Sequence, residues 1–235
     1  MLRSKYLGIV PLRKGSARIK NKNIKKILSK RLIDYTIEAV ISSKYLNEAV
    51  ITTDYASVIK TVNKNVKFKT IKRPKYLCTS NASMINVINH TLNHLKKKFN
   101  TTPDNLILLQ PTSPFRTAKD IDQAIKIYNK SNRKSLISIS TPFNSLDDQI
   151  LIQNDNYKFL KKYIPTKFKN YKNYFIDGAI YIINTNYFLQ KQKLWDQNSI
   201  LFQIKQSHSI DIDTNFDLEL ARSLAYYSKI NSKIF

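Results

Sequence analysis

The loop that follows residues 6–10 carries the types of residue that bind an anion. It places Arg13 and Lys22 around the small pair Gly15 and Ser16. The cations supply charge, the serine supplies a hydrogen bond, and the glycine lets the backbone approach a ligand. A basic, glycine-containing loop at the end of an apolar run is therefore a plausible site for a triphosphate. The loop matches neither the P-loop pattern GxxxxGK[ST] nor the pattern GxGxxG. A solvated loop in a basic protein is the alternative.

A second group of residues is acidic, in a chain with 16 acids against 40 Lys and Arg. Asp211, Asp213 and Asp217 lie within seven residues. On an extended strand, side chains two positions apart share a face, so Asp211 and Asp213 can converge on one point. Two carboxylates together with phosphate oxygens form a ligand set that suits Mg²⁺. Pairing with nearby lysines, or with the N-terminus of a following helix, is an equally simple reading.

A third polar group lies in the segment between Gln110 and Thr117, which leaves an apolar run and precedes a helical pattern. Gln110, Thr112 and Arg116 bring polar groups to the same edge, and two prolines stiffen the segment. An ordinary turn between a strand and a helix is the alternative. His90 and His94 are four residues apart, but Thr91 stands where the metal motif HExxH needs glutamate, so this pair does not predict a metal site.

Composition narrows the class of protein. A chain of 235 residues with 42% hydrophobic residues can bury one substantial core. The single cysteine, Cys78, excludes an intrachain disulfide, and no apolar run reaches the roughly 20 residues of a membrane span, which predicts a cytoplasmic protein with no membrane contact. The net charge of +24 is spread along the whole chain and comes with no known RNA- or DNA-binding motif, so we expect no nucleic-acid partner. A basic nucleic-acid-binding protein remains the alternative from another class.

Apolar runs alternate with helical patterns, which predicts a parallel sheet covered on both faces. The predicted strands are residues 6–10, 49–52, 66–71, 106–109, 135–140 and 179–183, with a short strand end at 210–213. The predicted helices are residues 31–43, 57–62, 83–99, 118–128 and 214–227. The stretch 141–175 breaks the rhythm and predicts an inserted arm or small β-subdomain. Ligands of such sheets bind beyond the carboxyl ends of the strands, where the polar groups described above are expected.

Six motifs, taken in this order, resemble those of the CMP-nonulosonate synthetases, also called acylneuraminate cytidylyltransferases. They are Pro11-Leu12-Arg13-Lys14-Gly15-Ser16 with Lys22-Asn23, Thr52-Thr53-Asp54, Arg73-Pro74 with Leu77 and Ser83, Gln110 to Arg116, Gly178-Ala179-Ile180-Tyr181, and Asp211-Ile212-Asp213. The resemblance implies one cytidylyltransferase domain over residues 1–235. Its fold would be a doubly wound, mostly parallel α/β sheet of the Rossmann-like nucleotidyltransferase type. It also implies a homodimer, with the stretch 141–175 as the dimerisation arm that reaches the partner's site.

The same resemblance implies a reaction and a set of roles. The anomeric hydroxyl of a nonulosonic acid, a sialic-acid-like sugar, would attack the α-phosphate of CTP and release pyrophosphate. The implied CTP-binding residues are Arg13, Ser16, Lys22, Asn23, Arg73 and Ser83. Gln110 and Arg116 would bind the sugar, Asp211 and Asp213 would bind Mg²⁺, and the implied catalytic residues are Arg13, Asp211, Asp213 and Lys167.

The chain departs from the family pattern at four positions. Ala17 stands in place of a lysine, Lys167 in place of an arginine, Ser80 in place of an acid, and Asp177 in place of an asparagine. Arg18 could restore the cation missing at position 17. Lysine at 167 keeps the charge but loses the two-pronged hydrogen bonding of arginine. These departures leave open which nonulosonic acid is used, and they leave a catalytically degenerate nucleotide-sugar binder as the alternative function.

Overall fold

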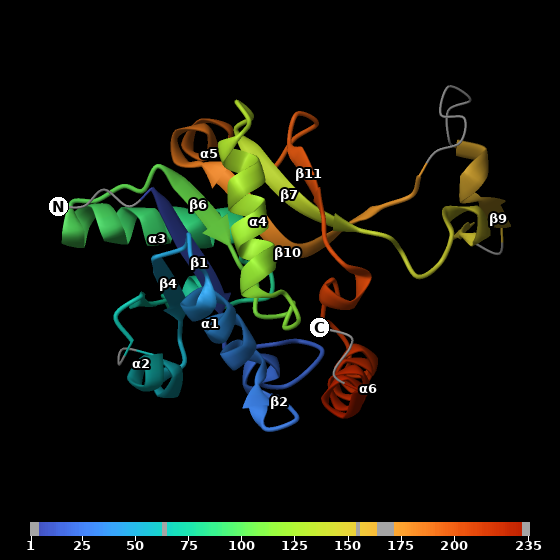
Figure 1. The fold of residues 1–235 in the computed structure, drawn as a ribbon, viewed down its shortest axis with the longest axis horizontal. Coiled ribbons are helices and arrows are strands. Elements are labelled where there is room, and N and C mark those ends of the chain that lie inside the picture. Colours follow the sequence, from blue (N-terminus) through green and yellow to red (C-terminus); the bar gives the residue numbers. More distant parts are fainter. Residues whose placement is uncertain (1–4, 63–64, 154–155, 164–171, 232–235) are drawn as a thin grey trace.

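The computed structural model describes residues 5–62, 65–153, 156–163 and 172–231, and its centre is a seven-stranded sheet (Figure 1). Along the sheet the strands are β5 (Phe68–Lys72), β4 (Glu48–Thr53), β1 (Tyr6–Leu12), β6 (Asn105–Leu108), β10 (Phe175–Asn184), β7 (Ser135–Ser140) and β11 (Ile200–Gln203). Every pairing is parallel except the two that β10 makes with β6 and β7. The expected mostly parallel sheet is confirmed.

Helices cover both faces of this sheet, because successive residues of its strands point to opposite sides. In β1, Val10 and Leu12 belong to one apolar cluster, while Leu7 and Ile9 belong to the other. The first cluster packs under α1 (Leu32–Ser42), α2 (Ala56–Val62) and α4 (Ala118–Asn129). The second packs under α3 (Met84–Phe99) and α5 (Thr185–Lys191). The doubly wound arrangement follows directly from this alternation.

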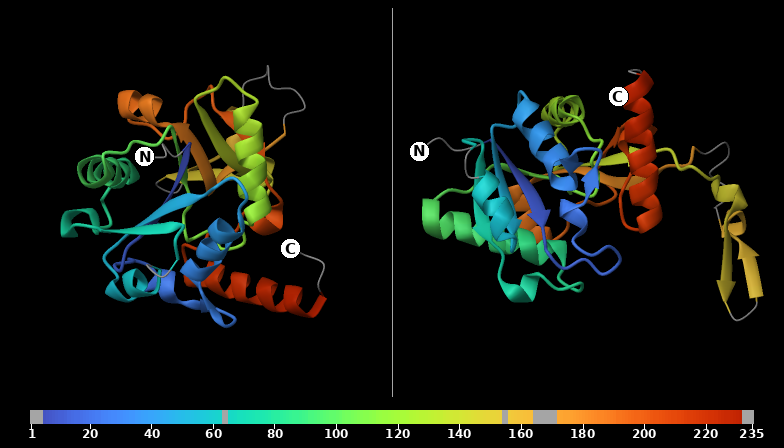
Figure 2. Two further views of the ribbon diagram at one scale, coloured as in Figure 1. Left: turned by 60° about the vertical axis from the view of Figure 1, so that its left-hand side comes forward. Right: turned by 90° about the horizontal axis from the view of Figure 1, so that it is seen from below.

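A third apolar cluster lies at the carboxyl edge of the sheet, where α6 (Asn215–Asn231) crosses (Figure 2). There α6 packs against the hairpin of β2 (Lys26–Ile27) and β3 (Lys30–Arg31). Ile212 and Phe115 are buried in this cluster. Through this cluster the segment before α6 packs against the loops that follow β1 and β6. Short 3₁₀ turns complete this edge: η1 (Lys22–Ile24), η2 (Lys75–Leu77) and η5 (Gln206–His208).

The stretch 141–175, predicted as an inserted arm or small β-subdomain, contains a second small hairpin. Its elements are η3 (Leu146–Asp148), β8 (Ile150–Gln153), β9 (Asn156–Phe159) and η4 (Leu160–Tyr163). Figure 1 shows this hairpin standing away from the main sheet. Lys167 lies outside the described residues. Among the helices of the described ranges, none is long and apolar enough to cross a membrane.

Two element predictions differ from the structure. Residues 210–213 form no strand, because among the described residues their backbone bonds the loop after β6 through one hydrogen bond, from the Ile212 amide to the Thr112 carbonyl at 2.8 Å, rather than through a ladder. The predicted strand at 66–71 begins later, at Phe68, since Asn65 closes a turn onto the backbone of Lys67 and Phe68 and leaves Val66 fully exposed. Sequence reasoning also missed α5 and the edge strand β11.

Candidate functional site

A cavity of about 300 Å³ opens at the carboxyl ends of the parallel strands, as predicted. Its walls come from the loop after β1, the segment between η2 and α3, the loop after β6, and the segment before α6. Eight of the predicted site residues line it: Arg13, Ser16, Lys22, Asn23, Arg73, Gln110, Asp211 and Asp213. Residues up to 200 positions apart in sequence therefore share one cavity.

The basic loop after β1 is held in place by contacts from the segment that follows β4 and by a contact within the loop. The Lys14 amide donates to Oδ1 of Asp54 at 2.7 Å, and the Tyr55 hydroxyl donates to the Lys14 carbonyl at 3.3 Å. Within the loop, Nδ2 of Asn23 donates to the Arg13 carbonyl at 3.2 Å. Because the backbone is fixed from both sides, the cationic side chains start from a defined position above the cavity.

Arg73 forms a buried cationic wall of the cavity. Its side chain donates to the Thr52 carbonyl at 2.9 Å and to the Thr52 hydroxyl at 3.4 Å. Burial lowers the pKa of Arg73 to about 10, which still leaves the guanidinium charged at neutral pH. A buried cation next to a cavity strongly favours an anionic or electron-rich ligand.

The two aspartates predicted to converge both line the cavity. Burial raises the pKa of Asp211, and the like charge of Asp213 raises it further, against the opposing effects of a hydrogen bond from Thr112 and the charge of Lys22. Asp213 accepts from Nζ of Lys22 at 2.9 Å. The third acid, Asp217, is turned away: it accepts from the amides of Asp213 and Thr214 and so caps α6.

The donor set of this pair fits a hard divalent cation. In the described part of the chain, no group of three or more His, Cys, Asp or Glu could hold a metal by itself. Asp211 and Asp213 instead offer two carboxylates at one end of a cavity lined with cations, so phosphate and water oxygens would have to complete the shell. Mg²⁺ is commonly held in this way, and it would also relieve the repulsion between the two acids.

Gln110 reaches the cavity next to a strand position that has no side chain. Gly178 in β10 adopts φ +75°, a backbone conformation that L side chains rarely adopt. A Cβ at this position would lie 3.6 Å from Nε2 of Gln110 and 3.9 Å from the Tyr181 hydroxyl. Both distances are ordinary van der Waals contacts, so it is the backbone conformation, and not a lack of space, that requires glycine here.

Comparison with known proteins agrees with this geometry. Residues 7–231 match the family described as "Cytidylyltransferase". The chain belongs to this family. It is 30% identical over 227 residues to the N-acylneuraminate cytidylyltransferase of Escherichia coli O18:K1:H7 (strain RS218 / NMEC), an alignment that covers 94% of this chain and 52% of that protein. The chain therefore spans about half the length of that relative.

Two relatives of similar length cover almost the whole cytidylyltransferase chain. The CMP-N,N'-diacetyllegionaminic acid synthase of Legionella pneumophila is 29% identical, and the alignment covers 94% of this chain and 96% of the relative. The pseudaminic acid cytidylyltransferase of Campylobacter jejuni has the same identity and coverage. Among solved structures, a CMP:2-keto-3-deoxy-manno-octonic acid synthetase complexed with CTP matches with a TM-score of 0.70 at 15% identity, covering 96% of this chain and 100% of that chain, which supports the fold.

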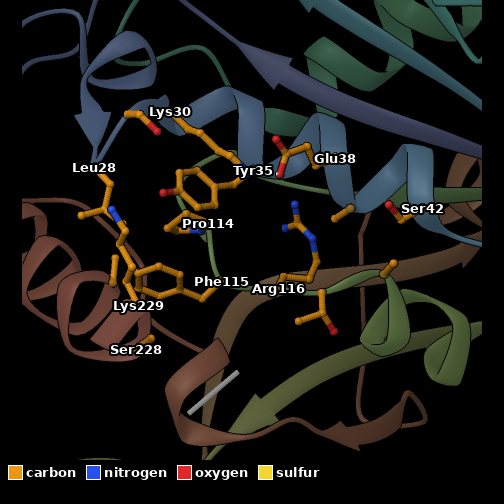
Figure 3. A pocket seen from close by; sticks show the side chains of 15 residues that line it. Leu28, Lys30, Tyr35, Glu38, Ser42, Pro114, Phe115, Arg116, Ser228 and Lys229 are labelled. Carbon is orange, nitrogen blue, oxygen red and sulfur yellow. Dashed lines mark hydrogen bonds and ion pairs between the residues drawn. The ribbon is translucent and has the colours of Figure 1, made fainter. Parts of the chain in front are cut away.

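Arg116 of this cytidylyltransferase does not line the cavity, although the family resemblance implied a contact with sugar. Its side chain is buried and donates to the carbonyls of Gln110 and Ala179, at 3.2 and 2.9 Å, and to the Thr36 hydroxyl at 2.9 Å. Figure 3 shows the guanidinium directed toward α1, in the wall of a second cavity of about 540 Å³ between α1, α6 and the Pro114 segment. The hydrogen bond from Arg116 to the Gln110 carbonyl thus holds Gln110 in position from outside the cavity.

Ser83 is also absent from the cavity lining. It caps α3, where its Oγ accepts the Asn86 amide at 3.2 Å. Sequence reasoning gave no role to Asp54 and Tyr55, which hold the basic loop. Asp54 carried a readable signal, because it is a rare acid directly after a buried strand. Tyr55 carried none, since its contact depends on where β4 ends relative to β1.

Proposed function

We propose that this cytidylyltransferase transfers CMP from CTP to the anomeric hydroxyl of a nonulosonic acid and releases pyrophosphate. The main observation in support of this proposal is the cavity at the carboxyl edge of the sheet. It combines the basic loop, the buried Arg73 and the pair Asp211 and Asp213. The names of the relatives, which include acylneuraminate, legionaminic and pseudaminic acid enzymes, support a substrate of this sugar class.

In this proposal the protein acts mainly by positioning and by charge, as is typical of nucleotidyl transfer. Arg13, Ser16, Lys22 and Asn23 bind the phosphates, and Arg73 lines the nucleotide side. Gln110, whose backbone carbonyl accepts a hydrogen bond from Arg116, orients the sugar. The cations of the loop stabilise the charge that builds up on the α-phosphate and on the departing pyrophosphate.

Asp211 and Asp213 have two roles in the proposal. They hold Mg²⁺, which when bound would neutralise charge on the phosphates. Asp211 lines the same end of the cavity as Asp213, and in this proposal it receives the proton of the attacking hydroxyl. Lys167 stays a predicted catalytic residue and Ser83 a predicted CTP ligand.

We also propose a homodimer formed through the hairpin of β8 and β9. Four of its large apolar side chains are exposed in the single chain: Ile150, Leu151, Ile152 and Phe159. Exposed apolar surface on a projecting hairpin is typical of a protein interface. A second copy of the chain would cover it and bring the arm to the partner's cavity.

The test is pyrophosphate release from CTP and Mg²⁺ with a panel of nonulosonic acids, with the products identified by mass. Release with one sugar supports the proposal and names the substrate. Asp213→Asn should lower turnover at least about 100-fold, because a metal carboxylate is worth several kcal/mol, while folding is kept since Asp213 is exposed. Glu219→Gln, an exposed acid on α6, is the matched control. CTP binding without any release would favour the degenerate binder instead.

A further inference from the structure

Two cations of the basic loop hold the Asp213 carboxylate from opposite sides. Nζ of Lys22 lies 2.9 Å from Oδ1, and Nη1 of Arg18 lies 3.2 Å from Oδ2. Lys22 is largely buried, with its side chain 11% exposed, and it also donates to the Ile212 carbonyl at 2.6 Å. In the part of the chain that the structure describes, the Arg18 side chain donates only to Asp213, and it is 67% exposed. The two cations therefore differ in how easily they can leave.

Both oxygens of Asp213 are thus in contact with cations of the loop. A divalent cation that binds this carboxylate must compete with Arg18 and Lys22 for it, and it would meet their repulsion. Exposed ion pairs such as Arg18 with Asp213 are weak, so Arg18 can be drawn away by a partner with more charge. A triphosphate in the adjoining cavity is such a partner, and arginine binds phosphate oxygens with two parallel hydrogen bonds.

We propose that Arg18 is a triphosphate-binding residue that Asp213 holds in the nucleotide-free enzyme. This inference rests on the proposed function, which places CTP and a divalent cation in the cavity. When Arg18 moves to the phosphates, Oδ2 of Asp213 becomes free for the cation. Nucleotide and divalent cation therefore bind cooperatively, and each raises the affinity for the other by the same factor.

The position of Arg18 in the loop supports this role. Ala17 brings no charge next to Ser16, which lines the cavity, so Arg18 is the first cation after it in the loop. Neither Arg18 nor Lys20 lines the cavity itself, but Arg18 contacts Asp213, which does, whereas Lys20 is an exposed cation with no such contact among the described residues. The two residues therefore form a matched pair of equal charge and different location.

The experiment compares Arg18→Gln with Lys20→Gln and uses two binding measurements that need no turnover. Mn²⁺ binding to the protein alone is followed by electron paramagnetic resonance, and CTP binding with Mg²⁺ but without sugar is followed by calorimetry. Arg18→Gln should bind Mn²⁺ alone about two- to fivefold more tightly and CTP about two- to fivefold more weakly, as expected for loss of an exposed charge pair. Lys20→Gln should change neither.

The opposite signs of the two effects distinguish the proposal from a general loss of charge or of folding. The inference is overturned if Arg18→Gln leaves CTP binding unchanged, if it weakens Mn²⁺ binding, or if Lys20→Gln reproduces both effects. Asp213→Asn separates this failure from a failure of the proposed function. If that variant binds Mn²⁺ like the unmodified chain, the proposed metal site itself is wrong. If it loses Mn²⁺ while Arg18→Gln shows no opposite effects, only the role of Arg18 is wrong.

Discussion

At the scale of single residues, the site depends on charges that are buried beside the cavity. Arg116 is the largest fully buried side chain, and burial lowers its pKa to about 10. Its buried position is tolerated because three oxygen acceptors surround it. Asp177 is also buried, and its Oδ1 accepts from the Ser138 hydroxyl and from the Ala179 amide, at 2.9 Å for the amide. Its Oδ2 has no hydrogen-bond partner among the residues that the structure describes.

The unpartnered oxygen makes Asp177→Asn a stabilising change at neutral pH. Burial raises the pKa of Asp177, so its ionised form costs stability above the ordinary aspartate range, and this cost disappears as the pH falls and the carboxyl takes up a proton. Asparagine can keep both bonds to Oδ1 and carries no charge. We expect a melting temperature about 2–4 °C higher at pH 7, the shift that ~1 kcal/mol gives in a chain of this size.

The measurement is thermal unfolding of both proteins between pH 4 and pH 7.5. The advantage of the variant should shrink toward the acidic end, where Asp177 itself becomes neutral. Asp148→Asn, a change at an exposed acid, is the control and should give no such trend. A variant that is less stable than the unmodified chain at pH 7 but not at pH 4 would show that the charge of Asp177 supports Arg116 by more than its burial costs.

At the scale of elements, the N-terminus of α4 fixes the segment that carries Gln110 and Arg116. Asp120 accepts from the Thr117 amide at 2.8 Å, and the Thr117 hydroxyl accepts from the Asp120 amide at 3.2 Å, which completes a capping box. Nδ1 of His208 lies 2.8 Å from Asp120 and joins η5 to the same point. One carboxylate therefore connects α4 to η5 in the segment before α6.

Asp120→Ala should remove this connection and lower the melting temperature. The loss of the cap costs about 0.5–2 kcal/mol, or roughly 2–8 °C for this chain length. The pKa of Asp120 is lowered: burial opposes the shift, but hydrogen bonds from His208 and Thr117 outweigh it. A lowered pKa means that the stabilisation is present above the ordinary aspartate range and is lost as the pH falls through the folded-state value.

Thermal unfolding of the variant and of the unmodified chain from pH 3.5 to pH 7.5 tests this expectation. The melting temperatures of the two proteins should converge at acidic pH. Lys119→Ala changes the neighbouring exposed position of the same helix turn and should leave the melting temperature nearly unchanged. A difference in melting temperature that stays constant over the whole pH range would mean that packing, and not the charge of Asp120, accounts for the effect.

The same scale shows why some elements could be predicted and others could not. The central strand β1 is buried along its whole length, so its apolar run was readable without any knowledge of its neighbours. The edge strand β11 buries only Phe202 and leaves Leu201 62% exposed, and its apolar run, Ile200 to Phe202, is only three residues long, which is too short to identify a strand. Residues 210–213 do alternate between buried and exposed positions, but too few bonds pair them with a neighbour to make a strand.

At the scale of the whole molecule, the fold brings together groups that sequence reasoning treats one at a time. The basic loop and the acidic pair were each predicted from local composition. Because ligands of parallel sheets bind beyond the carboxyl ends of the strands, the two were also expected at the same edge. The pairing of Arg18 with Asp213 joins residues 195 positions apart, and no local pattern contains it. The contact of Arg116 with the Gln110 carbonyl could not be predicted from the sequence either, because it depends on how α1 packs against the loop after β6.

The projecting hairpin carries the last prediction. Ile150 and Ile152 share one face of β8 and are 46% and 70% exposed, which is unusual for two isoleucines in a single folded chain. If a second copy covers this face, Ile150→Lys with Ile152→Lys should place two charges in an apolar interface and separate the copies. Light scattering should then give about one chain mass, 27.4 kDa, where the unmodified protein gives twice that value. Leu201→Lys changes an exposed leucine on β11 and should leave the dimer intact. A doubly substituted protein that keeps its dimer mass would place the interface elsewhere.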